Sequence, residues 1–304
     1  VGSEMCIRDR GWTDEEFRPI AVPAGKRLRP LLCLLSCEAS GGTWGDAIPA
    51  AAALELVHNF SLVHDDIQDR SPFRRHRPTV WKLWGEALAI NVGDALLILA
   101  CRAMEKLPPE KFRECCRILN NACLLLTEGQ FLDLTFEKLE TVSLEDYMEM
   151  IKRKTAALIA ASTQIGATIG TGDREIIERF RLFGENLGMA FQVQDDILGL
   201  WGEEAVTGKP VADDLRQRKK TLPILYAMEK DPRLSSMMAQ AIWGEDEVAV
   251  ALEIINQSGA REFAQEQARL FYERALAQLD GLGGDSEALQ ALREIASFII
   301  GREY

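Results

Sequence analysis

The chain has 304 residues, of which 47% are hydrophobic, and this is enough apolar material for one large core. Its formal net charge of −12 argues against nucleic acid or an anionic membrane surface as the main partner. None of the seven cysteines belongs to a C-x-x-C pair. Reduced thiols in a cytoplasmic protein are the simplest explanation, so we predict a cytoplasmic location.

Helical patterns cover most of the chain. Apolar residues recur with the spacing of an α-helix, and no sustained alternation or Asn-Gly turn indicates a β-hairpin. Glycine- and proline-rich breaks separate the helical segments at residues 41–42, 72–78, 108–109, 170–172, 202–210, 231–232 and 281–284. No stretch has the composition of a domain linker. We therefore predict a single all-α domain over residues 11–304, a bundle of about ten or more helices.

Two segments need a separate interpretation. Residues 1–10 lack helical periodicity, and we expect them to be a non-native or disordered extension. Residues 155–172 form the longest uncharged run, which raises the question of a membrane span. This run contains polar side chains and three glycines, which favour a buried core helix, so we predict no membrane span. Cys33 and Cys37, four residues apart on an apolar helix, are likewise predicted core residues.

The first charged cluster comes directly before an apolar helical segment. Lys26, Arg27 and Arg29 follow Gly25 at the start of that segment. Basic side chains beside the exposed N–H groups of a helix start form a suitable anion site. A solvated helix start has the same composition, so both interpretations remain open at this point.

The next segment, residues 54–69, begins as an apolar helix and ends in three carboxylates. Asp65 and Asp69 are four residues apart and project from one helix face, with Asp66 between them. Three neighbouring acids repel one another and are costly to bury bare, and Mg²⁺ with phosphate oxygens is the usual remedy. A solvated acidic helix end remains the alternative. Four arginines within residues 70–77 either balance this charge or bind anions.

A second apolar helical run, residues 191–198, repeats the pattern with Asp195 and Asp196. Two such helices facing each other would enclose a cavity with an acidic rim and an apolar body. Such a cavity suits a diphosphate held by Mg²⁺ with its hydrocarbon tail inside. With both motifs present, the chain resembles the trans-isoprenyl diphosphate synthases, most closely the short-chain farnesyl and geranylgeranyl enzymes. The resemblance extends over residues 24–304.

This resemblance implies the isoprenoid synthase fold, in which the helices surround a central apolar cavity. It implies a prenyltransferase that condenses isopentenyl diphosphate head to tail with an allylic diphosphate. The family requires Mg²⁺, with about three ions in each active site, and its members form homodimers.

Individual motifs carry the resemblance further. The family's G-K-R-x-R-P motif matches the basic cluster and implies that Lys26 and Arg29 bind isopentenyl diphosphate, together with His58 and Arg75. Without the resemblance, His58 is more simply a core histidine of an apolar helix. Arg74 is implied at the allylic diphosphate. His76 stands where the family has glycine.

Later motifs complete the predicted site. Residues 129–133 match a G-Q-x-x-D motif, whose Gln130 and Asp133 are implied near the reacting carbons or behind the metal ions. Lys154 and Thr155 match a K-T motif at the allylic diphosphate. The predicted metal ligands are Asp65, Asp66, Asp69, Asp195 and Asp196. The predicted catalytic residues are Asp65, Asp66, Asp69, Lys154, Asp195 and Lys219. The predicted substrate-binding residues are Lys26, Arg29, His58, Arg74, Arg75, Lys154, Thr155, Gln192, Lys209 and Lys219.

The second aspartate motif departs from the family pattern, because Gly199 replaces its third aspartate. Two acids can still bind one Mg²⁺ with water and diphosphate, so we expect activity to survive. This loss keeps open a non-catalytic subunit of a heteromeric synthase. A class I terpene cyclase would share the fold but needs no isopentenyl diphosphate site.

Product length is predicted from the residues before the first aspartate. In the family, the fourth and fifth preceding positions form the floor of the cavity, and here they are Ser61 and Phe60. One aromatic at the fifth position is typical of the C20 geranylgeranyl type. Helical geometry places Ser61 about 40° and Phe60 about 140° from Asp65 around the axis, so Phe60 reaches the cavity lower down or from the side.

Overall fold

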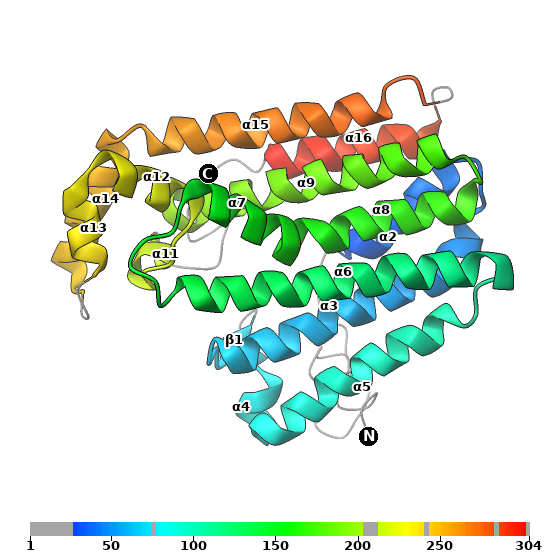
Figure 1. The fold of residues 1–304 in the computed structure, drawn as a ribbon, viewed down its shortest axis with the longest axis horizontal. Helices are drawn as coiled ribbons and strands as arrows, with labels where there is room; N and C mark the ends of the chain where they lie inside the picture. The colour runs from blue at the N-terminus through cyan, green and yellow to red at the C-terminus, as the bar shows by residue number, and fades with distance from the viewer. Residues whose placement is uncertain (1–26, 75–76, 203–211, 240–242, 283–285, 302–304) are drawn as a thin grey trace. The chain divides into compact units, whose positions relative to one another are not determined.

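A computed structural model describes residues 27–74, 77–202, 212–239, 243–282 and 286–301 (Figure 1). The predicted extension, residues 1–10, lies outside these ranges, as do Lys26, Arg75 and Lys209. The chain forms two compact units. The first contains residues 1–120 and 162–173, and the second contains residues 121–161 and 174–304. The helices α6 (Pro109–Phe136) and α8 (Ala157–Gly170) contribute residues to both.

In the first unit, helix α3 (Ile48–Gln68) packs against α2 (Leu28–Ala39) and α5 (Glu86–Met104). Its small and apolar residues, such as Ala53, Leu54 and Val57, are fully buried. A short 3₁₀-helix, Trp44–Ala47, leads into α3, whose first turn accommodates a proline because that position needs no N–H partner. The apolar stripe of the sequence therefore forms the helix face that joins α3 to its neighbours.

A tight β-hairpin follows α3. Strands β1 (Phe73–Arg74) and β2 (Arg77–Pro78) pair antiparallel, and α4 (Val80–Trp84) comes directly after them. The carbonyl of Ser71 closes the base of the hairpin, because it accepts hydrogen bonds from Thr79 Oγ1 at 2.9 Å and from Trp81 Nε1 at 2.8 Å. The described residues on either side of the predicted break at 72–78, Phe73–Arg74 and Arg77–Pro78, thus form a two-stranded ladder that is fixed to the end of α3.

In the second unit, α7 (Leu144–Ile151) continues through a π-helical turn, Lys152–Ala156, into α8. The long helix α9 (Arg174–Trp201) packs against α15 (Ala260–Leu279) and α16 (Glu287–Ile300), which run beside it in Figure 1. The remaining helices of this unit are α11 (Asp213–Arg216), α12 (Leu222–Lys230), α13 (Pro232–Met238) and α14 (Glu245–Gln257).

The all-α prediction is confirmed, and several helix ends agree with the predicted breaks. For example, α5 ends at Met104 before α6 begins at Pro109, and α12 ends at Lys230 before α13 begins at Pro232. The breaks between α4 and α5, between α6 and α7 and between α14 and α15 were not predicted. Side-chain caps reinforce several starts, since Ser143 Oγ accepts from the Asp146 N–H at 3.0 Å. Cys33 and Cys37 are fully buried, as predicted.

The uncharged run at residues 155–172 corresponds to α8, and it is largely buried, as predicted. A different helix has the length and composition of a membrane span. Among the described residues this is α5 alone, of which 33% is buried in its most apolar window. Core helices of globular domains have the same composition, and α5 buries Ala89, Val92 and Leu96.

Candidate active site

The three carboxylates at the end of α3 differ in their exposure to solvent. Asp69 is exposed and Asp65 is half-buried, whereas Asp66 is only 5% exposed. This division follows from the helix, since Asp65 and Asp69 share one face and Asp66 is rotated by about 100° from Asp65. Asp65 and Asp69 are therefore the more exposed carboxylates of the three, and Asp66 is the buried one.

Asp66 is bound to the hairpin instead. Its Oδ1 accepts from Arg74 Nε at 2.8 Å and lies 2.8 Å from Arg74 Nη2. Burial raises the pKa of the Asp66 carboxyl, and the charge and hydrogen bond of Arg74 oppose that rise. The ion pair fixes β1 to the last turn of α3. The predicted roles of Asp66 as a metal ligand and of Arg74 at the diphosphate both require this pair to be shared or opened.

The carboxylates at the end of α3 suit a metal ion whose other ligands are water and phosphate oxygens. No three His, Cys, Asp or Glu side chains within the described ranges lie close enough to hold a metal by themselves. Mg²⁺ commonly keeps several waters and uses one or two carboxylates together with phosphate oxygens. Asp65 and Asp69, two carboxylates on one helix face, therefore suit Mg²⁺ bound together with a diphosphate.

The basic cluster at the start of α2 contains a guanidinium with an unused donor. Arg27 precedes the helix in the left-handed region, with φ 44°, and its carbonyl accepts from the Leu31 N–H at 3.1 Å. The Nε of Arg29 is buried and has no hydrogen-bond partner among the described residues. Burial lowers the pKa of Arg29 to about 10, and Glu55 on α3 opposes this shift. A desolvated cation with a free donor is a suitable anion site.

His58 lies three residues after Glu55 on α3 and is half-buried. Its carbonyl accepts a hydrogen bond from Ser61 Oγ at 2.9 Å. Ser61 is buried, and the Phe60 ring meets the His64 ring edge-on with centroids 5.0 Å apart. Phe60 belongs to the apolar cluster between α3 and α5, so it lies on a different helix face from Asp65, as the geometry predicts.

The acidic end of α9 shows the same division as that of α3. Asp195 is exposed and Asp196 is only 2% exposed. Asp196 Oδ2 accepts from Tyr147 OH at 2.6 Å and from the Leu222 N–H at 3.2 Å, and Oδ1 accepts from Gln192 Nε2 at 3.0 Å. Burial raises the pKa of Asp196 to about 7, and the Tyr147 and Gln192 hydrogen bonds oppose the rise. Because both of its oxygens are engaged, Asp196 fits a structural role better than the predicted metal-ligand role.

The hydrogen bonds around Asp196 extend through Gln192 to Thr155 of the K-T motif. Thr155 Oγ1 donates to Gln192 Oε1 at 2.8 Å, so Thr155, Gln192, Asp196 and Tyr147 form one connected series. Tyr147, on α7, was not identified from the sequence. The available signal was its hydroxyl within a buried apolar stripe, because a buried tyrosine needs a hydrogen-bond partner.

Lys154 lies in the π-helical turn and pairs with Asp133 on α6. Gln130, one turn before Asp133, is buried. The turn therefore brings a residue of the K-T motif into contact with one of the G-Q-x-x-D motif. The two paired residues, Lys154 and Asp133, are 21 positions apart in the sequence. The structure places these predicted residues side by side in the second unit.

Gly199 is packed against a carboxylate. A Cβ at this position would lie 1.9 Å from Asp214 Oδ2, and Asp214 on α11 is 9% exposed. The carboxylate of Asp214 therefore lies where a side chain at position 199 would begin. The following loop is anchored by Lys220, whose Nζ donates to the Phe136 carbonyl at 2.6 Å at the end of α6, while Lys219 is exposed.

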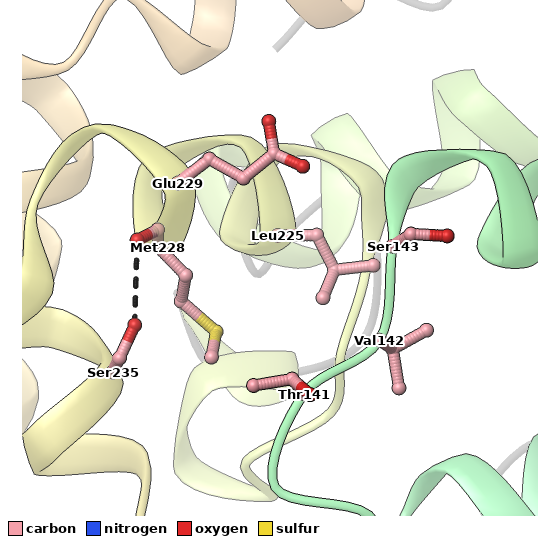
Figure 2. A pocket seen from close by; sticks show the side chains of 7 residues that line it. All are labelled: Thr141, Val142, Ser143, Leu225, Met228, Glu229 and Ser235. Carbon is pink, nitrogen blue, oxygen red and sulfur yellow. Dashed lines mark hydrogen bonds between the residues drawn. The ribbon is translucent and has the colours of Figure 1, made fainter.

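Two surface pockets are lined by residues of the second unit. One, of about 300 Å³, is shown in Figure 2, and its lining includes Leu225, Met228, Ser143 and Glu229. The other, of about 400 Å³, lies beside Phe131 on α6. Neither is lined by a predicted site residue.

Comparison with known proteins identifies the family. The polyprenyl synthetase family model matches residues 11–256. The chain belongs to the polyprenyl synthetase family. It is 38% identical over 301 residues to (2E,6E)-farnesyl diphosphate synthase of Mycobacterium tuberculosis, covering 96% of this chain and 84% of that protein. It is also 42% identical over 289 residues to the short chain isoprenyl diphosphate synthase of Methanothermobacter thermautotrophicus, covering 94% and 89%.

Solved structures agree. The crystal structure of polyprenyl synthetase from Streptomyces coelicolor A3(2) superposes with a TM-score of 0.91 at 36% identity, covering 98% of this chain and 91% of that one. Geranylgeranyl pyrophosphate synthetase from Pyrococcus horikoshii gives 0.87 at 40% identity, covering 92% and 86%. The predicted isoprenoid synthase fold and the assignment as a prenyltransferase are thereby confirmed.

The chain is a prenyltransferase of isoprenoid biosynthesis, in the family of the short-chain trans-isoprenyl diphosphate synthases. The names of its relatives cover several product lengths. They include farnesyl, geranylgeranyl and geranylfarnesyl diphosphate synthases, each 38% identical to this chain. Overall similarity therefore selects the reaction class and not the length of the product.

Proposed function

We propose that this synthase is Mg²⁺-dependent, condenses isopentenyl diphosphate with an allylic diphosphate and forms mainly geranylgeranyl diphosphate. The observation that carries the metal assignment is the division of the two acidic motifs by exposure. Asp65, Asp69 and Asp195 present carboxylates that are not fully buried. Asp66 and Asp196 are buried and hold neighbouring side chains. We assign the first three as metal ligands and the other two as their supports.

Bound Mg²⁺ supplies positive charge that stabilises the departing diphosphate and lowers the barrier to an allylic cation. Lys154 and Thr155 bind the allylic diphosphate, which requires Lys154 to exchange Asp133 for the substrate. Lys219, exposed on the loop before α12, and Arg74 add further positive charge. The cation has no need of a protein nucleophile, because the double bond of isopentenyl diphosphate attacks it and a proton is then lost to the released diphosphate.

Arg29 and His58 hold isopentenyl diphosphate in this proposal, with Lys26 and Arg75 assigned by their motifs. The buried Nε of Arg29, which has no hydrogen-bond partner among the described residues, supports an anionic ligand at the start of α2. A desolvated guanidinium gains most from a phosphate oxygen when no other acceptor competes for it. This second diphosphate site distinguishes a synthase from a class I terpene cyclase.

Product length is assigned to Phe60 with the small Ser61 beside it. Phe60 packs against the apolar cluster of α3 and α5 and meets the His64 ring edge-on, and we assign it the role of the floor that stops chain growth. A single bulky residue beside a small one supports a C20 product.

We also propose a homodimer. Helix α5 exposes Leu88 and Ile98, and the later part of α6 exposes Leu124 and Phe131, each by 47% or more. Apolar side chains of this size gather at protein interfaces. Light scattering of the purified protein should give twice the mass of the chain, and a monomer at micromolar concentration would contradict this. A cytoplasmic location remains a prediction from the cysteines.

One experiment tests the reaction. The purified chain is incubated with Mg²⁺, labelled isopentenyl diphosphate and allylic primers of three lengths, and the products are separated by chromatography. We expect labelled C20 diphosphate as the main product. Product formed without isopentenyl diphosphate would indicate a cyclase. Activity only after addition of a second subunit would indicate a heteromeric synthase, and activity that survives EDTA would contradict the metal assignment.

A further inference from the structure

The π-helical turn at Lys152–Ala156 interrupts the helix formed by α7 and α8. A π-turn adds one residue to a helical turn and is rare, and it persists only where surrounding contacts favour it. Here it carries Lys154 and Thr155, the two residues assigned to the allylic diphosphate. The contacts that hold the turn therefore decide where those two side chains are presented.

On one side the turn packs against α6 through a glycine. A Cβ on Gly129 would lie 2.3 Å from the Lys154 nitrogen and 2.6 Å from its Cα. Both atoms are backbone, so no side-chain rotation relieves the contact. Residues on either side of Gly129 bind the same turn: Glu128 pairs with Arg153 Nη1 at 2.7 Å, and Asp133 pairs with Lys154.

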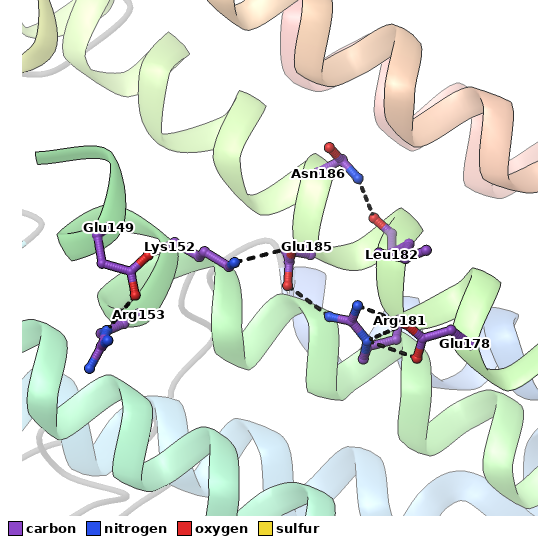
Figure 3. Close-up of polar contacts among 8 residues, drawn as sticks. All are labelled: Glu149, Lys152, Arg153, Glu178, Arg181, Leu182, Glu185 and Asn186. Carbon is purple, nitrogen blue, oxygen red and sulfur yellow. Dashed lines mark hydrogen bonds and ion pairs between the residues drawn. The ribbon is translucent and has the colours of Figure 1, made fainter. Parts of the chain in front are cut away.

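On the other side the turn packs against α9 in the same manner. A Cβ on Gly188 would lie 2.6 Å from the Ala156 Cα and 2.8 Å from its Cβ. Glu185, three residues earlier on α9, lies 3.8 Å from Lys152 Nζ. Figure 3 shows this ion pair as a dashed line. Gln192, four residues after Gly188, accepts the hydrogen bond from Thr155. Each neighbouring helix thus supplies one glycine for close approach and two polar partners for the turn.

We propose that Gly129 and Gly188 are positioning residues for the diphosphate site, and that the space they leave sets the place of Lys154 and Thr155. This inference rests on the proposed function of those two residues. Both glycines lie inside helices, where alanine is intrinsically the better helix former. The close backbone contacts give the physical reason for glycine at these two positions.

Gly129→Ala and Gly188→Ala test the proposal, with Gly172→Ala as the matched control. A Cβ on Gly172 would meet nothing within 4 Å, and its φ lies outside the left-handed region. Each variant is assayed for kcat and for the KM of both substrates. Each is also titrated in Mg²⁺ with a non-ionising thiodiphosphate analogue of the allylic primer. We expect the KM for the primer and the Kd of the analogue to rise about ten-fold or more, with the KM for isopentenyl diphosphate unchanged.

A purely structural role for the glycines would lower the folded fraction and kcat while both KM values stayed at the wild-type level, and that result would overturn the proposal. If the wild type makes no product with any primer, the proposed function fails, and analogue binding by the variants then decides the positioning role. Failure of the wild type to bind the analogue would overturn both. If neither alanine variant folds, Gly188→Ala combined with Ala156→Gly, which removes one of the two closest contacts, is measured in their place by the same criteria.

Discussion

At the scale of single residues, adjacent aspartates in each motif differ in environment and therefore in role. Asp65 and Asp195 reach solvent, whereas Asp66 and Asp196 are buried and accept hydrogen bonds from Arg74 and Tyr147. Helical rotation alone predicts that neighbours point apart, but not which of them faces the core. That depends on partners far along the chain, since Tyr147 lies 49 positions from Asp196.

Asp65→Ala removes a proposed metal ligand from the leaving-group side of the reaction. We expect kcat to fall by about 10²-fold or more, because charge stabilisation of the diphosphate is lost. Steady-state kinetics in Mg²⁺ measure the effect. Asp246→Ala, an exposed aspartate in the first turn of α14, is the control and should retain wild-type kcat. An Asp65→Ala enzyme that turns over at half the wild-type rate would be incompatible with the metal assignment.

Arg29→Ala and Lys154→Ala separate the two diphosphate sites. Loss of a charge-assisted phosphate contact costs about 1.5–3 kcal/mol, which corresponds to a KM change of about ten-fold or more. We expect Arg29→Ala to raise the KM for isopentenyl diphosphate and Lys154→Ala to raise the KM for the primer. The measurement is a two-substrate kinetic analysis of both variants. If both weaken the same substrate, the division of the sites is wrong.

At the scale of elements, the helices were predictable and their irregularities were not. Glycines and prolines mark most helix ends in the sequence, as Pro109 and Pro232 show at the starts of α6 and α13. The π-turn at Lys152–Ala156 has no local signal, because it depends on glycines of α6 and α9 that are distant in sequence. The hairpin after α3 also escaped prediction, since its two-residue strands are too short to show alternation.

The contact between α9 and α11 leads to a prediction about the missing third aspartate. Gly199→Asp would restore the family motif but would place its Cβ against the carboxylate of Asp214 and add a like charge beside it. We expect a lower Tm in Mg²⁺-free buffer and no gain in kcat. The double variant Gly199→Asp with Asp214→Gly should recover Tm, because the space is restored. Thermal denaturation measures both, and a more stable single variant would refute the packing argument.

At the scale of the whole molecule, the family and its fold were predictable because the motifs occur in order along nearly the entire chain. Two acidic motifs, a basic motif and late lysines carry that information without any knowledge of packing. Product length depends on where side chains meet across helices. Product length is therefore harder to predict from the sequence than the family or the fold.

Phe60→Ala tests the length assignment. Removal of the ring opens space between α3 and α5, where Phe60 contacts His64, and we expect products longer by at least one five-carbon unit. Chromatography of the dephosphorylated alcohols gives the distribution. Phe73→Ala, at an exposed aromatic in the hairpin, should leave the distribution unchanged. The same product distribution in Phe60→Ala and the wild type would place the floor of the cavity elsewhere.

Among the described residues, Lys111 and Lys220 bind the carbonyls of helix ends. Lys111 Nζ donates to the Thr168 carbonyl at 2.6 Å in the last turn of α8, and Lys220 Nζ does the same for Phe136 in α6. An ammonium engaged by backbone carbonyls is shielded from acylating reagents while its helix end stays intact. Mass-spectrometric mapping of lysine acylation therefore reports the opening of each helix end separately, before the rest of the fold is lost.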